Sequence, residues 1–458
     1  MRSERIHILN KAPIRQGKYV LYRMQASQRL GCNLALCEAA RLANETGLPL
    51  LILFHLKADY PDANYRHFKF MAEGLTECAA GAQRAGIGFE LTDLPQELLA
   101  ATYHDQAAAI VCDRGYLRHQ KAWNEDIALH ALCLTEEVED NLIVPIASAT
   151  HKAEWSARTI RPKLMAKLPY FITDASTPLP RLHHPYPSTN DHNLETLTRF
   201  LEIIRRKAYL SPVEYPGGEQ VALKTLETFI PNKLPQYSEL RSDPTRSSGS
   251  RLSAYLHFGQ ISPLQILQRI SSLPDSVAFT EQLLVRRELS HNFVHYTPGY
   301  DTYEALPNWC RQTLQVHSPD THPYIYTTEQ LENSRTHDPY WNAAMNEMRL
   351  TGYMENTMRM YWGKKIIEWS ATPEEAYTTI LQLNNRYFTD GRDANSYASI
   401  GWCFGLHDRP WPSHPIFGTV RTMTASGLSR KYPMDAYCRK WLSTFNSEVN
   451  PKSQTNNF

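Results

Sequence analysis

The sequence lacks several features that would place it in a membrane or in an oxidising compartment. No stretch reaches the ~18 apolar residues of a membrane span, and the N-terminus, MRSERIHILN, lacks the apolar run of a signal peptide. The eight cysteines are scattered and form no CxxC pair. This pattern is typical of reduced thiols and argues against a zinc site or a disulfide framework. We therefore expect an intracellular protein with no membrane contact and no bound metal.

Two nucleotide-binding motifs and a strong net charge are also missing. No GxGxxG and no GxxxxGK[ST] occurs, so neither a dinucleotide fingerprint nor a Walker loop is present. The 48 basic residues nearly balance the 47 acidic ones, for a formal net charge of +1. Any contact with nucleic acid must therefore come from a local basic patch. With 458 residues, 42% of them hydrophobic, the chain is long enough for two or three globular domains.

Residues 1–150 alternate strand and helix signals, and the predicted N-terminal domain spans residues 1–172. Buried strands are predicted at Lys18–Tyr22, Leu50–His55 and Ala108–Cys112, and helices at Cys32–Thr46 and Tyr65–Gly86. Strands separated by helices predict βαβ units and a doubly wound parallel sheet. The polar stretch 22–29, YRMQASQR, follows the first strand, where such a sheet tends to place ligand contacts.

The rest of the chain is predicted to be mostly helical. Residues 173–193 contain four prolines, paired histidines and small polar residues, a composition typical of a linker. Helix signals then continue over residues 194–445, and the polar residues 446–458 predict a flexible tail. The predicted fold is an α/β N-terminal domain followed by a larger all-α C-terminal domain.

Residues 336–411 are unusually rich in Trp, Met, Tyr and Asn. Within them, residues 341–369 have the length of one long helix or of two abutting helices, with Gly352 and Gly363 as weak points. On one straight helix Trp341, Trp362 and Trp369 would lie on nearly the same face. Tryptophans at this spacing more often fill a core than serve a cofactor.

Three polar residues set this segment apart from an ordinary core. Arg359 and Asp390 are charges flanked by apolar sequence, and such charges usually persist only when paired. Asn384 lies late in an otherwise apolar helix, which Thr372 and Pro373 are predicted to begin and which ends near Tyr387.

The motifs THDPYWNAA, MRMYWGKKIIEW, DGRD and GLHDRPW resemble those of the class II cyclobutane pyrimidine dimer photolyases, which are light-driven DNA-repair flavoproteins of the photolyase/cryptochrome family. The resemblance runs along nearly the whole chain. It implies a lyase in which excited, reduced FAD gives one electron to a pyrimidine dimer flipped out of DNA, the cyclobutane ring opens and the electron returns. It also implies that residues 1–172 form an antenna-type domain for a second chromophore of deazaflavin or folate type.

A hydroxyl-rich stretch around Gly249 precedes a predicted helix. Such stretches can bind phosphate, but more often they only cap the helix. The resemblance implies that this loop holds the FAD pyrophosphate, through Tyr237, Gly249, Ser250, Arg251, Leu252 and Ser253.

The resemblance also assigns residues to the reactive end of the flavin. Arg359 and Asp390 match an ion pair beside the isoalloxazine ring, and Asn384 matches an asparagine beside its N5 atom. Arg287 and Asp393 match further cofactor contacts. A fixed positive charge favours an anionic reduced flavin.

Three tryptophans match an electron relay that photoreduces the oxidised flavin and takes no part in repair itself. Trp362 is expected next to the flavin, Trp341 follows, and Trp369 is expected nearest to solvent.

Substrate contacts are expected at Met360 and Trp402, which match positions that receive the flipped bases. In residues 279–289 the family has a carboxylate that contacts the lesion, and either Glu281 or Gln282 holds that position here. If it is Gln282, a carboxamide replaces the carboxylate. Basic residues late in the chain are expected either to contact DNA phosphates or to form a solvated face: Arg421, Arg430, Lys431, Arg439 and Lys440.

The main alternative is a cryptochrome-like photoreceptor that keeps the flavin and the tryptophans but signals through a partner. The short sequence after Asn446 argues against it, because signalling relatives usually carry long extensions. A flavoprotein with no light role is a third reading, which the spacing of the tryptophans disfavours. The expected partner is damaged DNA, bound by a monomer in the cytoplasm, nucleoid or nucleus.

Overall fold

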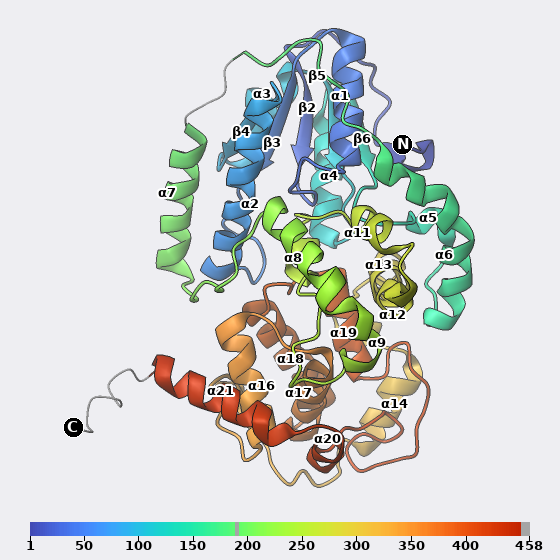
Figure 1. Cartoon of the computed structure of the whole chain (residues 1–458), viewed down its shortest axis with the longest axis vertical. Helices are drawn as coiled ribbons and strands as arrows, with labels where there is room; N and C mark the ends of the chain where they lie inside the picture. The colour runs from blue at the N-terminus through green and yellow to red at the C-terminus, as the bar shows by residue number, and fades with distance from the viewer. Residues whose placement is uncertain (188–191, 450–458) are drawn as a thin grey trace, which may run out of the picture. The chain divides into compact units, whose positions relative to one another are not determined.

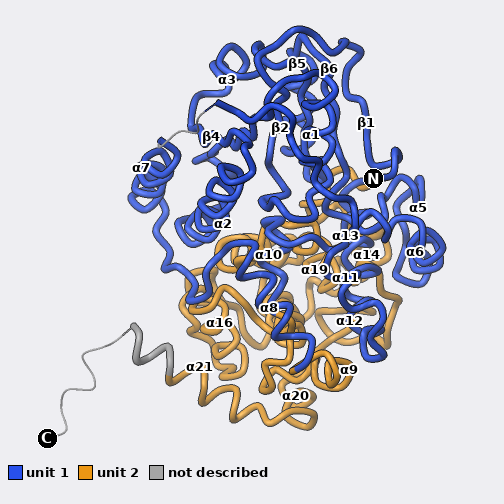
Figure 2. The backbone as a smooth tube through the Cα atoms, turned by 45° about the horizontal axis from the view of Figure 1, so that its top comes forward, with its two compact units in different colours: residues 1–231, 251–295 blue, residues 232–250, 296–458 orange. Residues whose placement is uncertain are grey.

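The computed structural model describes residues 1–187 and 192–449 of the chain. Contacts within the backbone group the chain into two compact units, which Figure 2 shows in two colours. Unit 1 comprises Met1–Pro231 and Arg251–His295, and unit 2 comprises Asn232–Ser250 and Tyr296–Phe458. The helical region predicted from residue 194 onward therefore contributes to both units. The division at residues 173–193 into two functional domains stays a prediction.

Unit 1 is built around a six-stranded sheet in the order β1-β6-β5-β2-β3-β4 (Figure 1). The strands are β1 (Ile6–Ile8), β2 (Tyr19–Met24), β3 (Leu50–His55), β4 (Gly88–Thr92), β5 (Ala107–Asp113) and β6 (Leu134–Val138). All pairings are parallel except that of β1 with β6. The predicted parallel, doubly wound sheet is confirmed, and β2 and β5 lie side by side at its topological switch point.

The helices of unit 1 connect and cover these strands. They are α1 (Leu34–Thr46), α2 (Tyr65–Arg84), α3 (Gln96–Thr102), α4 (Arg118–His130), α5 (Ile146–Ala149), α6 (Ala157–Phe171), α7 (His192–Lys207), α8 (Glu219–Asn232), α10 (Ser253–His257), α11 (Pro263–Ile270), α12 (Val277–Thr280) and α13 (Arg287–Tyr296). A π-helical turn, Glu281–Arg286, joins α12 to α13. Helix α1 shows why these bounds arise, because Asn33 caps its first turn and Gly47, at φ 68°, ends it.

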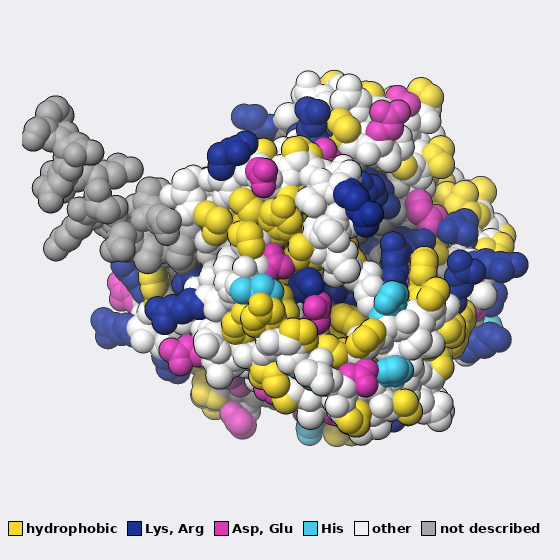
Figure 3. Space-filling model, turned by 90° about the horizontal axis from the view of Figure 1, so that it is seen from below, with side chains coloured by type: hydrophobic (Ala, Val, Ile, Leu, Met, Phe, Trp, Pro, Cys, Tyr) yellow, Lys and Arg dark blue, Asp and Glu magenta, His cyan; other side chains and the backbone are white. Residues whose placement is uncertain are grey.

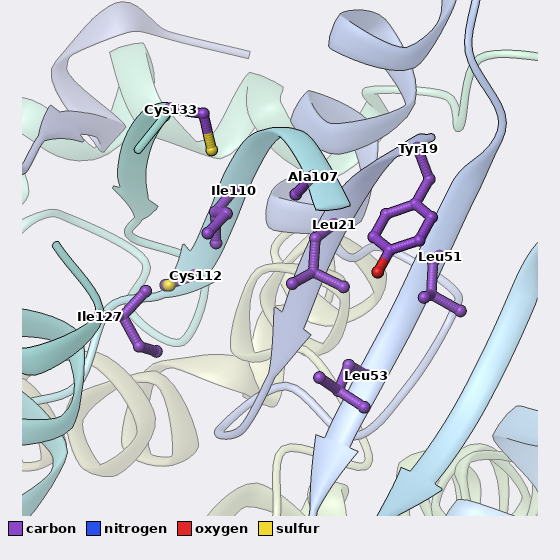
Figure 4. Packing of buried hydrophobic residues seen from close by; sticks show 9 residues of the cluster. All are labelled: Tyr19, Leu21, Leu51, Leu53, Ala107, Ile110, Cys112, Ile127 and Cys133. Atoms are coloured by element: carbon purple, nitrogen blue, oxygen red, sulfur yellow. The ribbon is translucent and has the colours of Figure 1, made fainter. Parts of the chain in front are cut away.

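Buried apolar side chains on one face of the sheet form the core that Figure 4 shows. Strands β2, β3 and β5 and helix α4 supply most of it: Tyr19, Leu21, Leu51, Leu53, Ala107, Ile110, Cys112, Ile127 and Cys133. In β2 and β3 alternate residues point to this face, as the period of two in a strand requires. In β5 the pairing with β2 shifts register beside Tyr19, and Ala107 joins Ile110 and Cys112 in the same cluster.

Unit 2 is helical and contains no β-strand among the residues that the structure describes. Its helices are α9 (Tyr237–Leu240), α14 (Asn308–His317), α15 (Thr328–Glu332), α16 (Pro339–Thr351), α17 (Asn356–Trp369), α18 (Pro373–Tyr387), α19 (Ala394–Cys403), α20 (Ala425–Lys431) and α21 (Met434–Val449). The α/β-plus-helical fold class is thus confirmed. Residues 446–449, predicted as part of a tail, continue α21, and residues 450–458 lie outside the described residues. Within the described part of the chain, no helix has both the length and the apolarity to cross a membrane.

Helices α16 and α17 resolve one of the alternatives left open by the sequence. The segment forms two helices, because Gly352 adopts φ 65° and ends α16 in the left-handed region that favours glycine. The expectation for a single straight helix, with all three tryptophans on one face, is therefore wrong. Gly363 does not break α17; it gives close packing instead, since a Cβ there would lie 2.7 Å from Cys403 Sγ. Thr372 caps α18 as predicted, accepting a hydrogen bond from the Glu375 amide at 3.1 Å.

Candidate functional site

An ion pair between α17 and the segment after α18 forms the centre of the site in unit 2. Arg359 Nη2 lies 2.7 and 3.0 Å from the two carboxylate oxygens of Asp390. The side chains are 23% and 12% exposed, respectively. The guanidinium carbon also lies 3.7 Å from the ring centroid of Phe388. The two charges are therefore compensated before any ligand binds, and one face of the guanidinium is covered by an aromatic ring.

Asn384 lies in the last turn of α18, shortly before Asp390 in the sequence, and its side chain is buried. Its Nδ2 donates to Asn385 Oδ1 at 3.1 Å, and the same oxygen accepts from the Arg392 amide at 3.1 Å. Asn385 thereby orients the Asn384 amide. The carbonyl of Asn384 accepts from the Phe388 amide, which ends the helix in the usual way.

The three tryptophans are brought together by the turn between α16 and α17. Trp341 on α16 donates from Nε1 to the carbonyl of Trp362 on α17 at 3.0 Å. Its ring centroid lies 5.6 Å from that of Trp369, with the planes at 67°. Trp362 in turn lies 6.3 Å from Phe388, the ring that covers Arg359. A continuous series of contacts thus leads from Arg359 to Trp369, in which the link between Trp341 and Trp362 runs through the Trp362 backbone carbonyl.

All three tryptophans are buried, at 2% exposure or less. Trp369 is the last ring in this series of contacts, but its side chain is only 1% exposed. Its expected position nearest to solvent therefore stays a prediction. Trp362 Nε1 is buried and has no hydrogen-bond partner among the described residues. A buried donor of this kind normally has an acceptor, so the site suits a ligand that carries one.

The part of the predicted phosphate loop that belongs to unit 2 packs beside the start of α17. A Cβ on Gly249 would lie 2.4 Å from Tyr353 Oη and 3.2 Å from Glu355 Oε2, so only glycine fits there without displacement. Thr357 Oγ1 donates to the Ser242 carbonyl at 2.7 Å. Burial raises the pKa of Tyr237, which keeps its phenol protonated as a donor. Gly249 therefore packs against the residues that lead into α17, and Ser242 is bound to the first turn of that helix, which also carries Arg359.

The loop continues into unit 1 at Arg251. Arg251 has φ 61°, a strained value for a residue other than glycine. Leu252 is fully buried, and Ser253 is the first residue of the short helix α10. Strained backbone is concentrated at functional sites, which supports a role for this turn.

The predicted lesion-contacting segment in unit 1 lies in the π-helical turn 281–286. Glu281 is held by two arginines: Arg161 Nη2 lies 2.7 Å and Arg286 Nε 3.2 Å from its carboxylate. Partial burial raises the pKa of Glu281, but the hydrogen bonds and charges of the two arginines outweigh burial and lower it. Gln282 is half-buried beside it. Arg287 Nη1 donates to the Asn141 carbonyl at 2.6 Å.

Three other predicted residues are placed on helices of unit 2. Met360 follows Arg359 on α17 and is half-buried, as is Trp402 near the end of α19. Asp393 caps α19 by accepting from the Asn395 amide at 2.8 Å. Capping of α19 is a structural role for Asp393 that does not depend on any cofactor contact.

Basic side chains of unit 2 lie against aromatic rings. Arg421 is 4.9 Å and Arg409 5.7 Å from the ring of Trp411, and Lys440 is 4.4 Å from that of Trp441. Figure 3 shows Lys and Arg side chains interspersed with hydrophobic, His and acidic side chains on one face. Such a mixture suits a nucleic acid, whose phosphates and bases need both kinds of contact.

Several residues of the site were not predicted from the sequence. Phe388, Tyr353 and Glu355 pack against predicted residues, but nothing in their spacing distinguishes them from ordinary core positions. Tyr326 and His337 lie beside Trp369. His337 belongs to the THDPYW motif, which was the only available signal for it.

Comparisons with known proteins show the family of the chain. The protein-family profile described as DNA photolyase matches residues 20–183. A deoxyribodipyrimidine photo-lyase of Methanothermobacter thermautotrophicus is 42% identical over 95% of this chain and 97% of its own length. Another, from Potorous tridactylus, is 36% identical over 93% of this chain and 81% of its own length. The chain therefore belongs to the DNA photolyase family, which is part of the wider photolyase/cryptochrome family.

Solved structures show the same fold. A crystal structure described as an archaeal photolyase from Sulfolobus tokodaii with two FAD molecules has a TM-score of 0.71 at 16% identity, and covers 95% of this chain and 94% of that one. The α/β sheet and the helical region are thus those of a photolyase.

Proposed function

We propose that the chain is a light-driven deoxyribodipyrimidine photo-lyase of class II that repairs cyclobutane pyrimidine dimers in DNA. The full-length relationship to enzymes of that name supports the activity. The class is supported by the motifs around Trp341, Trp362 and Trp402. The observation that carries the proposal is the continuous set of contacts from the Arg359–Asp390 pair through Phe388 to the three tryptophans.

The residues present in unit 2 fit FAD. When bound, FAD supplies the light absorption and the transferable electron on which the reaction depends. Arg359 favours a negatively charged, reduced isoalloxazine, while Asp390 keeps the guanidinium paired and fixed. Asn384 and the indole N–H of Trp362 are donors that can hydrogen-bond its polar atoms. Tyr237, Gly249 and Ser250 would hold the phosphates, and a role for Arg251, Leu252 and Ser253 in the same contact stays a prediction of the sequence.

The tryptophans serve to keep the cofactor reduced. Trp362 would donate first, Trp341 would refill Trp362, and Trp369 would refill Trp341. The hydrogen bond from Trp341 to the Trp362 carbonyl and the 5.6 Å contact to Trp369 hold the rings in this order. Their burial excludes water and stray oxidants from each step.

Substrate binding requires that the dimer leave the stack, because stacked bases cannot reach a buried electron donor. Met360 and Trp402 provide apolar surfaces for the extruded bases. The Glu281 carboxylate already forms ion pairs with Arg161 and Arg286. Gln282 is therefore the better candidate for the lesion contact, so a neutral carboxamide takes the place of a carboxylate.

A repair assay separates this function from that of a cryptochrome-like photoreceptor. Purified protein loaded with FAD is mixed with dimer-containing DNA and a reductant, then illuminated or kept dark. Light-dependent loss of dimers supports the lyase. Photoreduction with the dimers untouched would support the photoreceptor, and no photochemistry at all would contradict both.

We further propose that residues 1–172 form an antenna-type domain joined by residues 173–193 to an FAD-binding domain over residues 194–445. A second chromophore of deazaflavin or folate type in the antenna domain would be found by extracting the purified protein and recording the absorption spectrum of the extract. Gel filtration with light scattering tests the proposed monomer. Fractionation of the source cells tests the proposed intracellular location, in cytoplasm, nucleoid or nucleus.

A further inference from the structure

A buried lysine in the second half of α17 lacks a counterion. Lys364 is 2% exposed, and it forms no ion pair with any carboxylate among the residues that the structure describes. Its ammonium donates to the backbone carbonyl of Cys403, and the ring centroid of Phe417 lies 5.9 Å from the nitrogen. Lysine is almost never fully buried unless it is paired. The contact between this charge and the Cys403 carbonyl therefore needs a physical explanation.

The carbonyl that Lys364 binds belongs to the last residue of α19. The last carbonyls of a helix have no partner inside it. The Trp402 carbonyl is satisfied by the backbone, because it accepts from the amide of Gly405 at 3.1 Å. The Cys403 carbonyl accepts from the lysine instead, and the helix dipole favours a positive charge at this end. Lys364 thus completes the cap of α19 from a different helix.

Helix α19 is fastened to α17 near both of its ends. At its end, a Cβ on Gly363, the residue before the lysine, would lie 2.7 Å from Cys403 Sγ, so the two helices approach closely there. Near its start, Ser396 Oγ donates to the carbonyl of Asp390 at 3.2 Å, and Asp390 pairs with Arg359 of α17. The lysine is therefore the second of two polar links between α17 and α19.

These two helices carry the side chains that we propose as surfaces for the extruded bases. Met360 lies one turn before Lys364 on the same face of α17. Trp402 directly precedes Cys403 on α19. The lysine thus connects the helical face that carries one of these side chains to the backbone beside the other. Small displacements of groups that receive a substrate cost much of its binding, even when their cause lies outside the site.

We propose that Lys364 is a positioning residue for the flipped pyrimidine dimer. Its ammonium, bound to the Cys403 carbonyl, fixes Trp402 relative to Met360, so that both surfaces meet the bases together. No bond is made or broken at the lysine. This inference rests on the proposed function, because Met360 and Trp402 receive bases only if the protein takes a dimer out of the DNA stack.

The charge on Lys364 can be removed by pH without any substitution. Burial lowers its pKa from 10.5 to about 8. The groups that face it are Cys403 of α19, Asp408, Arg421 and Cys310 of α14. Burial raises the pKa of the Cys310 and Cys403 thiols to about 12 and about 11, so both stay neutral while the ammonium loses its proton. The bond to the carbonyl is then that of a neutral amine, which is roughly half as strong.

Binding assays in the dark with the FAD-loaded, chemically reduced protein test the proposal. Each variant is titrated with a dimer-containing duplex and with the same duplex without the dimer. Lys364→Met keeps the length of the side chain but removes the charge and the donor. It should weaken binding to the dimer-containing duplex about tenfold, the order of one hydrogen bond to a charged group, and leave binding to the undamaged duplex unchanged. In light, the KM for repair should rise by a similar factor, while kcat should change less.

Lys365→Met is the matched control. Lys365 is the next residue of α17 and is 8% exposed, but its ammonium pairs with Glu368 at 2.6 Å. This variant should bind both duplexes as the wild type does. Equal weakening of dimer binding in the two variants would overturn the proposal. So would a loss in Lys364→Met that is the same for damaged and undamaged DNA, because that pattern indicates a general structural defect.

The pH dependence of the wild type gives a second test that needs no variant. The ratio of its affinities for the dimer-containing and the undamaged duplex should fall severalfold between pH 7 and pH 9, as Lys364 loses its charge. The ratio should stay constant in Lys364→Met. If circular dichroism shows that this variant does not fold, the wild-type profile decides alone, and a constant ratio would then overturn the proposal.

Failure of this inference differs visibly from failure of the proposed function. Wild-type protein that prefers dimer-containing DNA and repairs it in light, together with a Lys364→Met variant that does the same, would overturn the role of the lysine alone. Wild-type protein that binds both duplexes equally and leaves the dimers intact in light would overturn the proposed function as well.

Discussion

The indole N–H of Trp341 donates to the backbone carbonyl of Trp362 at 3.0 Å, although the two residues stand on different helices. Trp341→Phe removes this hydrogen-bond donor. It also replaces an easily oxidised indole with a benzene ring, which is much harder to oxidise, while an aromatic group stays in place. We expect photoreduction to fall at least tenfold and the free energy of unfolding to fall by about 1 kcal/mol. Photoreduction under continuous light and urea unfolding measure the two effects. Trp155→Phe, at a 55% exposed position of unit 1, is the control; equal photoreduction in both variants would contradict the relay.

The Arg359–Asp390 pair predicts a linked effect on stability and cofactor binding. Asp390→Asn leaves the largely buried guanidinium without its counterion. We expect the free energy of unfolding to fall by about 2 kcal/mol, as for a hydrogen bond to a charged group, and the FAD content of the purified protein to fall with it. Asp435→Asn, an exposed position in the first turn of α21, is the control. Unchanged FAD content in Asp390→Asn would show that the pair serves only the fold.

Gly249 predicts a steric effect that a second substitution should relieve. Gly249→Ala places a methyl group 2.4 Å from the position of Tyr353 Oη, which must move. We expect a loss of bound FAD, measured as absorbance of the cofactor per chain. In the double variant with Tyr353→Phe the clashing oxygen is absent, so FAD binding should recover. A loss that the second substitution does not relieve would assign the defect to the backbone at Gly249.

Substitutions at the neighbouring residues Glu281 and Gln282 should have different effects, one on stability and the other on DNA binding and repair. Gln282→Glu restores a carboxylate at the proposed lesion contact and should change the affinity for dimer-containing DNA and the repair rate, with little effect on stability. Glu281→Gln removes the partner of Arg161 and Arg286 and should lower stability by up to about 1 kcal/mol. Urea unfolding and binding assays on both variants decide the matter. If Glu281→Gln alone altered DNA binding, the assignment would be reversed.

Glu288 predicts a defined pH dependence of stability in unit 1. Burial raises the pKa of its carboxyl to about 8, from an ordinary value of 4.5. Between these values the folded state holds a proton that the unfolded state has released, so stability falls as pH rises, by at most about 1.4 kcal/mol per pH unit. Glu288→Gln should make this slope smaller, as urea unfolding at pH 5, 6.5 and 8 would show, while Glu136, whose pKa burial raises to about 7, should keep part of it. The exposed Glu227→Gln should leave the slope as in the wild type; a slope in Glu288→Gln equal to that of the wild type would contradict the assignment.

The strands of unit 1 were predictable where their sequences are apolar and not where they are charged. Leu50–His55 was read directly, because LLILFH has no competing interpretation. Strand β6, LTEEV, was missed because two glutamates interrupt its pattern. The two glycines of 341–369 could not be told apart from the sequence. Gly352 ends a helix and Gly363 does not, and only the packing of Gly363 on Cys403 decides this.

The sequence named candidate residues for the site, whose roles stay predictions, but it did not predict their arrangement. Arg359 and Asp390 were paired in the sequence reading through a family resemblance, and the structure shows the ion pair itself. The contact of Trp341 with Trp362 depends on a chain reversal that the tryptophan spacing does not encode. Tyr326 reaches Trp369 through the path of a loop, which no periodicity predicts.

The carbonyl of Gly352 also accepts a hydrogen bond from the amide of Thr389 at 2.9 Å. A straight helix would have separated Trp341 from Trp362 by about 30 Å along its axis, whereas the turn at Gly352 brings the Trp341 indole within hydrogen-bonding distance of the Trp362 carbonyl. The same peptide group fastens the residue next to Asp390. The proposed electron relay and the proposed ion pair beside FAD therefore both depend on the backbone at Gly352, and a substitution that alters this turn should affect both.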